Sequence, residues 1–157
     1  MMKAIQRFLL ALVLILLASC TPLTEASQAQ QVLERYFSAL AAGDYATADS
    51  LYGGDYQIFL DWNHDLTLDD HATLWERACH WNGLNCLAVR SSKLIAQQYD
   101  IFTFSVEFSN PDGSLYVLGP CCGSDETTMP PLLRFDIRVR RDANGQFKVL
   151  DLPVYSP

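Results

Sequence analysis

The spacing of the apolar residues changes at Gly83, and this change limits the folds open to the chain. Before Gly83 the apolar residues recur every three or four positions, which is typical of helices. After it they alternate with polar residues, most clearly in 102–108 and 133–139, as in strands with one buried face. Helices followed by antiparallel strands predict an α+β fold, with the N-terminal helices packed on a curved antiparallel sheet.

Three helices are expected before Gly83. The first covers 30–42, and its apolar face consists of Val32, Leu33, Tyr36, Phe37 and Leu40. The second covers 45–52 with Asp44 as its cap, and the third runs over 70–81 with Asp69 as its cap. The inward-facing residues of the third are expected to be Leu74, Trp75, Ala78 and Cys79.

Shorter segments complete the predicted order. Residues 56–60 are expected to form a short strand, and 61–70 a polar loop. One strand is expected within 86–98, although the alternation is blurred at 91–93. The turn signal at 110–113 predicts a return strand at 115–118, and the turn at 142–145 leads into a strand at 147–152.

The first residues have the pattern of an export signal. Lys3 and Arg7 precede an unbroken apolar run at 8–17. Ten helical residues rise about 15 Å, half of a hydrocarbon core of roughly 30 Å, so the run fits a signal peptide better than a membrane span. We expect residues 1–19 to be this signal, 20–28 a tether and 29–157 a single domain.

The signal ends in Leu17-Ala18-Ser19-Cys20, which resembles the bacterial lipobox. This resemblance implies that Cys20 receives a lipid, becomes the new N-terminus and anchors the chain to a membrane, facing outside the cytoplasm. Thr21 stands where the inner-membrane retention signal of enteric bacteria has aspartate. The sequence leaves open whether the anchor lies in the cell membrane or the outer membrane.

The segment VLERYFSALAAGDYATADSLYGGDY, residues 32–56, resembles the opening of the NTF2-like (SnoaL-like, cystatin-like α+β cone) superfamily. The resemblance implies a sheet curved into a cone that helices plug. Some members are isomerase-like enzymes with an acidic base inside the cone, and many are binding or accessory modules. Another small α+β lipoprotein domain is the alternative fold.

The charge of the chain excludes some partners. The net charge is -7, and two of the 11 basic residues lie in the expected signal, which has no acidic residue. The remainder therefore has nine basic against 18 acidic residues. This balance argues against binding a nucleic-acid backbone or adhering electrostatically to anionic lipid.

Four cysteines follow Cys20, and an even set in an exported chain favours disulfides. Pairing Cys79 with Cys86 is slightly favoured, and it would leave Cys121 and Cys122 as a strained vicinal disulfide. The alternatives pair both of the first two cysteines with the last two. The C-x6-C and adjacent spacings, even with His80 added, do not match zinc sites.

No cofactor or metal site is predicted. Residues 61–69 carry oxygen ligands at alternate positions, but Leu66 and Ala72 stand where a calcium loop needs glycine and glutamate.

Candidate pocket residues are Tyr36, Asp61, His64, His71 and Trp75. Asp61, His64 and Asp65, or His71 with Glu76, could form an acid–base pair at a pocket mouth, although a solvated loop explains them as well. Trp62 and Trp81 are further aromatic candidates. No catalytic dyad is visible in the strands, so we expect a binding or accessory module with an unknown small-molecule or protein partner. One alternative is an enzyme of the isomerase or hydratase kind, using a pocket carboxylate or histidine. Another is a structural envelope protein whose pocket is filled by its own side chains.

Overall fold

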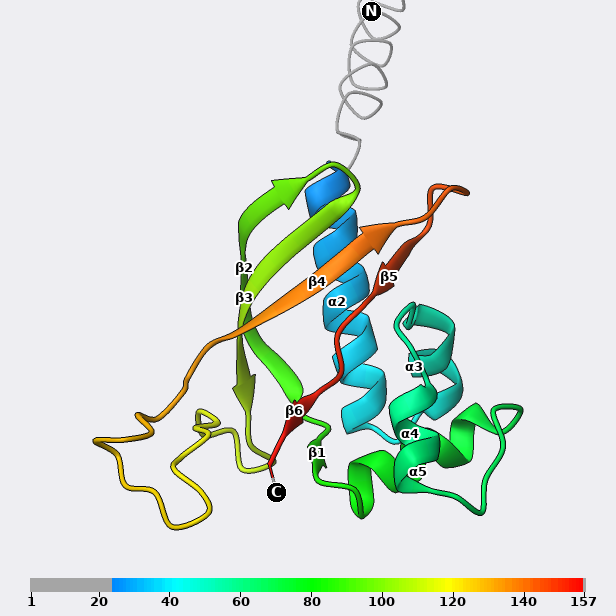
Figure 1. Cartoon of the computed structure of the whole chain (residues 1–157). Coiled ribbons are helices and arrows are strands. Elements are labelled where there is room, and N and C mark those ends of the chain that lie inside the picture. The colour runs from blue at the N-terminus through cyan, green and yellow to red at the C-terminus, as the bar shows by residue number, and fades with distance from the viewer. Residues whose placement is uncertain (1–23, 157) are drawn as a thin grey trace, which may run out of the picture.

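The computed structural model describes residues 24–156, which form an α+β fold as predicted (Figure 1). The helices are α2 (Glu25–Ala41), α3 (Tyr45–Leu51), α4 (Gln57–Trp62) and α5 (His71–His80). The strands are β1 (Leu84–Asn85), β2 (Ala88–Gln98), β3 (Ile101–Ser109), β4 (Phe135–Arg141), β5 (Phe147–Val149) and β6 (Val154–Tyr155). The expected signal and Cys20 lie outside the described residues. Within 24–156, no helix combines the length and apolarity needed to cross a bilayer.

Four strands form an antiparallel sheet in the order β2-β3-β4-β5, while β1 and β6 pair separately. Phe104 of β3 lies between Leu94 of β2 and Ile137 of β4. The register between β2 and β3 shifts after Val89 and again after Leu94. Such shifts mark β-bulges, and they explain why the alternation is blurred in this part of the sequence.

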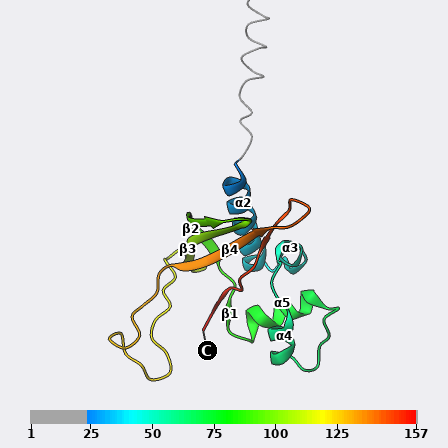
Figure 2. The same cartoon turned by 45° about the horizontal axis from the view of Figure 1, so that its top comes forward.

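The core lies between α2 and one face of the sheet (Figure 1). Every second residue of β3 is buried there, namely Phe102, Phe104, Val106 and Phe108. Phe37 of α2 meets Phe108 edge to face, with ring centroids 4.8 Å apart. Burying one such side chain contributes about 1.5–3 kcal/mol, so these rings fix α2 on the sheet. Helices α3, α4 and α5 lie together at one side of the sheet (Figure 2).

Two helix starts differ from the prediction, and a side-chain cap explains each. Thr24 Oγ1 accepts a hydrogen bond from the Ser27 N–H at 3.2 Å, so α2 begins at Glu25 and residues 25–28 are helix, not tether. Asp70, not Asp69, caps α5, because its carboxylate accepts from the Thr73 N–H at 3.2 Å. Asp44 caps α3 as predicted.

The strand expected at 56–60 is wrong, because this segment is part of α4. The Asp55 carboxylate accepts a hydrogen bond from the Gln57 N–H at 2.9 Å and starts the helical turn. The helical turn buries Phe59 completely while Ile58 stays exposed. Both residues are apolar, so a short segment of this kind does not reveal its period from sequence.

Two predicted strands are shorter than expected, while the one expected within 86–98 is present as β2. Residues 115–118 make only isolated bridges, from Leu115 to Ser109 and from Leu118 to Leu132. The short strand β1 at 84–85 was not predicted. Strand β5 ends at Val149, although 147–152 is expected to be extended. Beyond Leu150 the chain diverges from β4 (Figure 1), so no neighbouring strand remains to pair with it.

Candidate functional site

Helices α3 and α5 bring a carboxylate and an imidazole together. Asp49 lies on α3, and His71 is the first residue of α5. Asp49 Oδ1 lies 2.8 Å from His71 Nδ1 and also accepts a hydrogen bond from the Tyr56 hydroxyl. A carboxylate oxygen only accepts, so Nδ1 of His71 must carry the proton that it shares with Asp49. The same oxygen therefore receives two hydrogen bonds.

Tyr56 connects this pair to the core. Its ring stacks on the His71 ring, with centroids 3.9 Å apart and planes within 5°. Its hydroxyl accepts a hydrogen bond from Trp75 Nε1 at 3.1 Å. Burial raises the pKa of Tyr56 far above its usual value, and the hydrogen bond to Asp49 raises it further. Tyr56 therefore stays protonated and remains a donor to Asp49 at physiological pH.

Two of the predicted pocket residues, Tyr36 and Trp75, are core residues. Both side chains are completely buried, and their rings meet edge to face with centroids 5.8 Å apart. The Tyr36 hydroxyl has no hydrogen-bond partner within the described chain. Burial raises the pKa of Tyr36 well above its usual value. Because Tyr36 is completely buried and lines neither of the two pockets described below, we assign it a packing role.

The remaining acid–base candidates do not gather around a pocket. Asp61 accepts a hydrogen bond from Gln57 Nε2 at 3.1 Å, along its own helix. Asp65 pairs with Arg77 at 2.6 Å, and hydrogen bonding from Arg77 lowers the pKa of Asp65. His64 joins neither contact. Among residues 24–156, no three His, Cys, Asp or Glu side chains are arranged to hold a metal ion.

Sequence reasoning paired His71 with the wrong carboxylate. Glu76 is five residues away on α5, whereas the observed partner, Asp49, is 22 residues away on α3. No local pattern marks Asp49, because its role depends on how α3 packs against α5. Periodicity can place each helix but not the contact between two of them.

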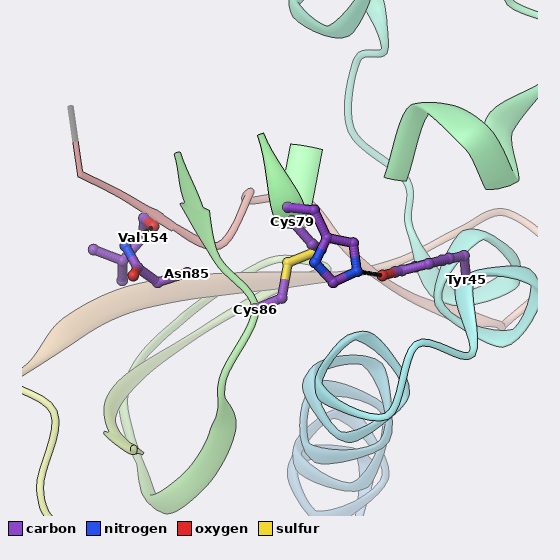
Figure 3. The surroundings of a disulfide bond; sticks show 6 residues. Tyr45, Cys79, Asn85, Cys86 and Val154 are labelled. Carbon is purple, nitrogen blue, oxygen red and sulfur yellow. Dashed lines mark hydrogen bonds between the residues drawn. A yellow bond between two sulfur atoms is a disulfide. The ribbon is translucent and has the colours of Figure 1, made fainter. Parts of the chain in front are cut away.

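The favoured disulfide is confirmed. Cys79 at the end of α5 is bonded to Cys86, just after β1, with Cα atoms 5.5 Å apart (Figure 3). Asn85, beside it, donates through Nδ2 to the Val154 carbonyl at 3.0 Å. His80 Nε2 lies 3.1 Å from the Tyr45 hydroxyl. The disulfide thus joins α5 to the small β1–β6 sheet.

The disulfide borders a surface pocket of about 470 Å³. Its walls come from the end of α2, from α5 and from β1, and the residues lining it include Leu40, Tyr45, Cys79, His80 and Cys86. His80 Nε2 is hydrogen-bonded to the Tyr45 hydroxyl, so Nδ1 of His80 and the remaining hydrogen-bonding capacity of that hydroxyl are what this pair leaves for a ligand.

The other two cysteines are not bonded to each other. Cys121 and Cys122 are free thiols in the loop between Leu118 and Leu132, and their Sγ atoms lie 2.8 Å apart. Hydrogen bonding to Cys122 raises the pKa of Cys121. A raised pKa disfavours the thiolate, which is the nucleophilic form of cysteine.

A larger groove of about 530 Å³ lies where the C-terminal segment leaves the edge of β4. It is lined by the apolar residues Leu118, Leu132, Phe135, Ile137, Leu152 and Val154, and by the charged residues Arg134, Asp136 and Asp151. Leu132 at its rim is 47% exposed. Sequence analysis did not identify this groove, because its walls come from segments far apart in the chain.

Comparisons of the chain with protein-family models, with characterised proteins and with solved structures find no match.

Proposed function

We propose that this protein is an exported lipoprotein, anchored through Cys20, whose domain binds a partner at its surface and has no catalytic role. The observation that carries the placement of binding at the surface, and not inside the fold, is the filled interface between the helices and the sheet. Tyr36, Trp75 and Phe104 are completely buried in it. In an NTF2-like cone, this is where a ligand would enter, so the chain's own aromatic rings occupy that position here.

Two independent features support export. The lipobox-like segment 17–20 is typical of lipoproteins, and the disulfide between Cys79 and Cys86 suits an oxidising compartment. Disulfides persist outside the cytoplasm, whereas cytosolic thiols are kept reduced. One acyl chain holds a protein only weakly, but the two or three chains of a mature lipoprotein hold it durably.

The environment of the Asp49–His71 pair favours a binding role over an isomerase-like role. Asp49 already accepts hydrogen bonds from His71 and Tyr56, so it is committed to holding α3 and α5 together. A general base must reach a substrate proton directly or through one water. The grooves described above are lined by other residues, so a substrate bound in either would not meet this pair.

Metabolic labelling with an alkyne fatty acid tests the anchor. The full-length chain, Cys20→Ser and the control Cys121→Ser are produced in a bacterial host that processes lipoproteins. Wild type and Cys121→Ser should be labelled and found with membranes, while Cys20→Ser should be unlabelled. Labelling of Cys20→Ser, or an unlabelled wild type, would contradict the proposed anchor.

A further inference from the structure

The edge of β4 that faces β5 is only partly paired. Strand β5 pairs with β4 at Val139, Arg140 and Arg141. At the next position along this edge, the Leu150 N–H donates to the Arg138 carbonyl at 2.9 Å. The Arg138 N–H donates instead to the Asp151 carboxylate at 2.6 Å, so a side chain replaces the missing strand there.

Asp136 presents the next free backbone groups on this edge. In an antiparallel ladder, residues two apart direct their N–H and C=O groups to the same side. The N–H and C=O groups of Asp136 therefore point to the same side as those of Arg138, whereas the backbone groups of Phe135 and Ile137 point toward β3. No strand or bridge of the described chain pairs with Asp136 on this side, because the C-terminal segment has diverged (Figure 1).

The groove of about 530 Å³ lies directly against these unpaired groups. Four apolar residues from outside β4, Leu118, Leu132, Leu152 and Val154, line the same groove as Asp136. Two of the groove's three charged side chains are paired, Arg134 with Glu107 at 2.9 Å and Asp151 with Arg138. The third, the exposed carboxylate of Asp136, forms no ion pair among the described residues. A free N–H and C=O beside apolar side chains match an extended backbone with apolar side chains.

We propose that an extended, uncharged peptide segment of a partner protein binds in this groove by adding a short strand to β4 at Asp136. The peptide would donate to the Asp136 carbonyl and accept from its N–H, while alternate apolar side chains pack on the groove walls. This inference rests on the proposed binding function and names the class of partner and the place where it binds.

The test uses the full-length chain purified in detergent and a fluorescent hexapeptide, acetyl-Thr-Val-Ser-Val-Thr-Val-amide. Binding is followed by fluorescence anisotropy. Two further peptides carry N-methyl groups on either the odd-numbered or the even-numbered amides. A strand directs alternate amides to one edge, so one methylated peptide should lose about tenfold in affinity while the other stays within about twofold of the parent.

Variants at Asp136 test the same contact from the protein side. Asp136→Pro removes the N–H that faces the groove, and proline is tolerated at a strand edge where that group makes no ladder bond. Asp136→Ala keeps the N–H and is the matched control. Asp136→Pro should lose about tenfold in affinity and Asp136→Ala less than about twofold. Circular dichroism checks the fold of both variants, and the methylated peptides remain decisive if Asp136→Pro does not fold.

Several results would overturn the inference: no binding by the wild type, equal binding of the two methylated peptides, or unchanged binding by a folded Asp136→Pro. A wild-type dimer in sedimentation that Asp136→Pro abolishes would make a second copy of this chain the occupant instead. Absence of peptide binding in a chain that is labelled at Cys20 rejects strand addition alone. Peptide binding by an unlabelled chain rejects the anchor alone.

Discussion

Asp49 lies 2.8 Å from His71, through Oδ1 and Nδ1, and this contact joins two helices that are separated by α4 in the chain. Both side chains are about one third exposed. The Tyr56 hydroxyl donates to the same carboxylate oxygen and accepts from Trp75 Nε1. The carboxylate therefore connects α3, the start of α4 and α5 through one oxygen atom.

Replacing Asp49 with alanine should destabilise the domain by about 1–3 kcal/mol, because the Tyr56 hydroxyl and the His71 N–H lose their acceptor. The lower half of this range is expected, since the site is partly open to water. Urea denaturation followed by tryptophan fluorescence measures the change. Ser50→Ala, one residue along α3, is the control. Equal stability of the two variants would show that the contact contributes nothing.

The sequence predicted the elements whose pattern is local. The alternation in β3, the cap at Asp44 and the Cys79–Cys86 bond each depend on residues close together in the chain. The contact between Asp49 and His71 and the groove beside β4 depend on packing between distant segments, and nothing local marks them. The strand predicted at 56–60 is wrong, because this segment belongs to α4. Five residues are too few to distinguish the two-residue period of a strand from the 3.6-residue period of a helix.

Cys79→Ser combined with Cys86→Ser should lower the free energy of unfolding by about 2.5 kcal/mol, the value expected for cross-linking a loop of this length. The closed loop spans a sequence separation of seven. Urea denaturation of the double variant against the wild type measures the loss. Cys121→Ser combined with Cys122→Ser is the control, because these thiols are free. A similar loss in both double variants would argue against the assigned pairing.

The cap of α5 should make stability depend on pH. Hydrogen bonding from Thr73 lowers the pKa of Asp70. A carboxyl group with a lowered folded-state pKa stabilises the fold above its unfolded pKa of about 3.9, and this stabilisation is lost as the pH falls through the folded value. Asparagine is as good a cap but does not titrate. The melting temperature of Asp70→Asn should therefore fall less between pH 6 and pH 2 than that of the wild type.

Asp69→Asn is the control for this prediction, because the neighbouring carboxylate does not cap α5. Its melting temperature should follow the wild-type pH dependence. If Asp69→Asn reduced the pH dependence and Asp70→Asn did not, the cap would be the one expected from sequence and not the one in the structure.

Gly83 and Gly113 have the same φ of +81°, but their surroundings differ. A Cβ at Gly83 would lie 2.6 Å from the Ser156 carbonyl oxygen, beside β6, whereas a Cβ at Gly113 would meet nothing within 4 Å. The left-handed conformation alone costs an alanine about 1–2 kcal/mol. Gly113→Ala should lose about this much stability, and Gly83→Ala should lose more, because the Ser156 N–H donates to the Gly83 carbonyl and holds the two segments close.

Urea denaturation of both variants measures the difference, and limited proteolysis of the C-terminal segment should be faster only in Gly83→Ala. Equal losses would mean that the β1–β6 sheet yields without cost, and the disulfide at Cys86 would then be attached to a movable segment.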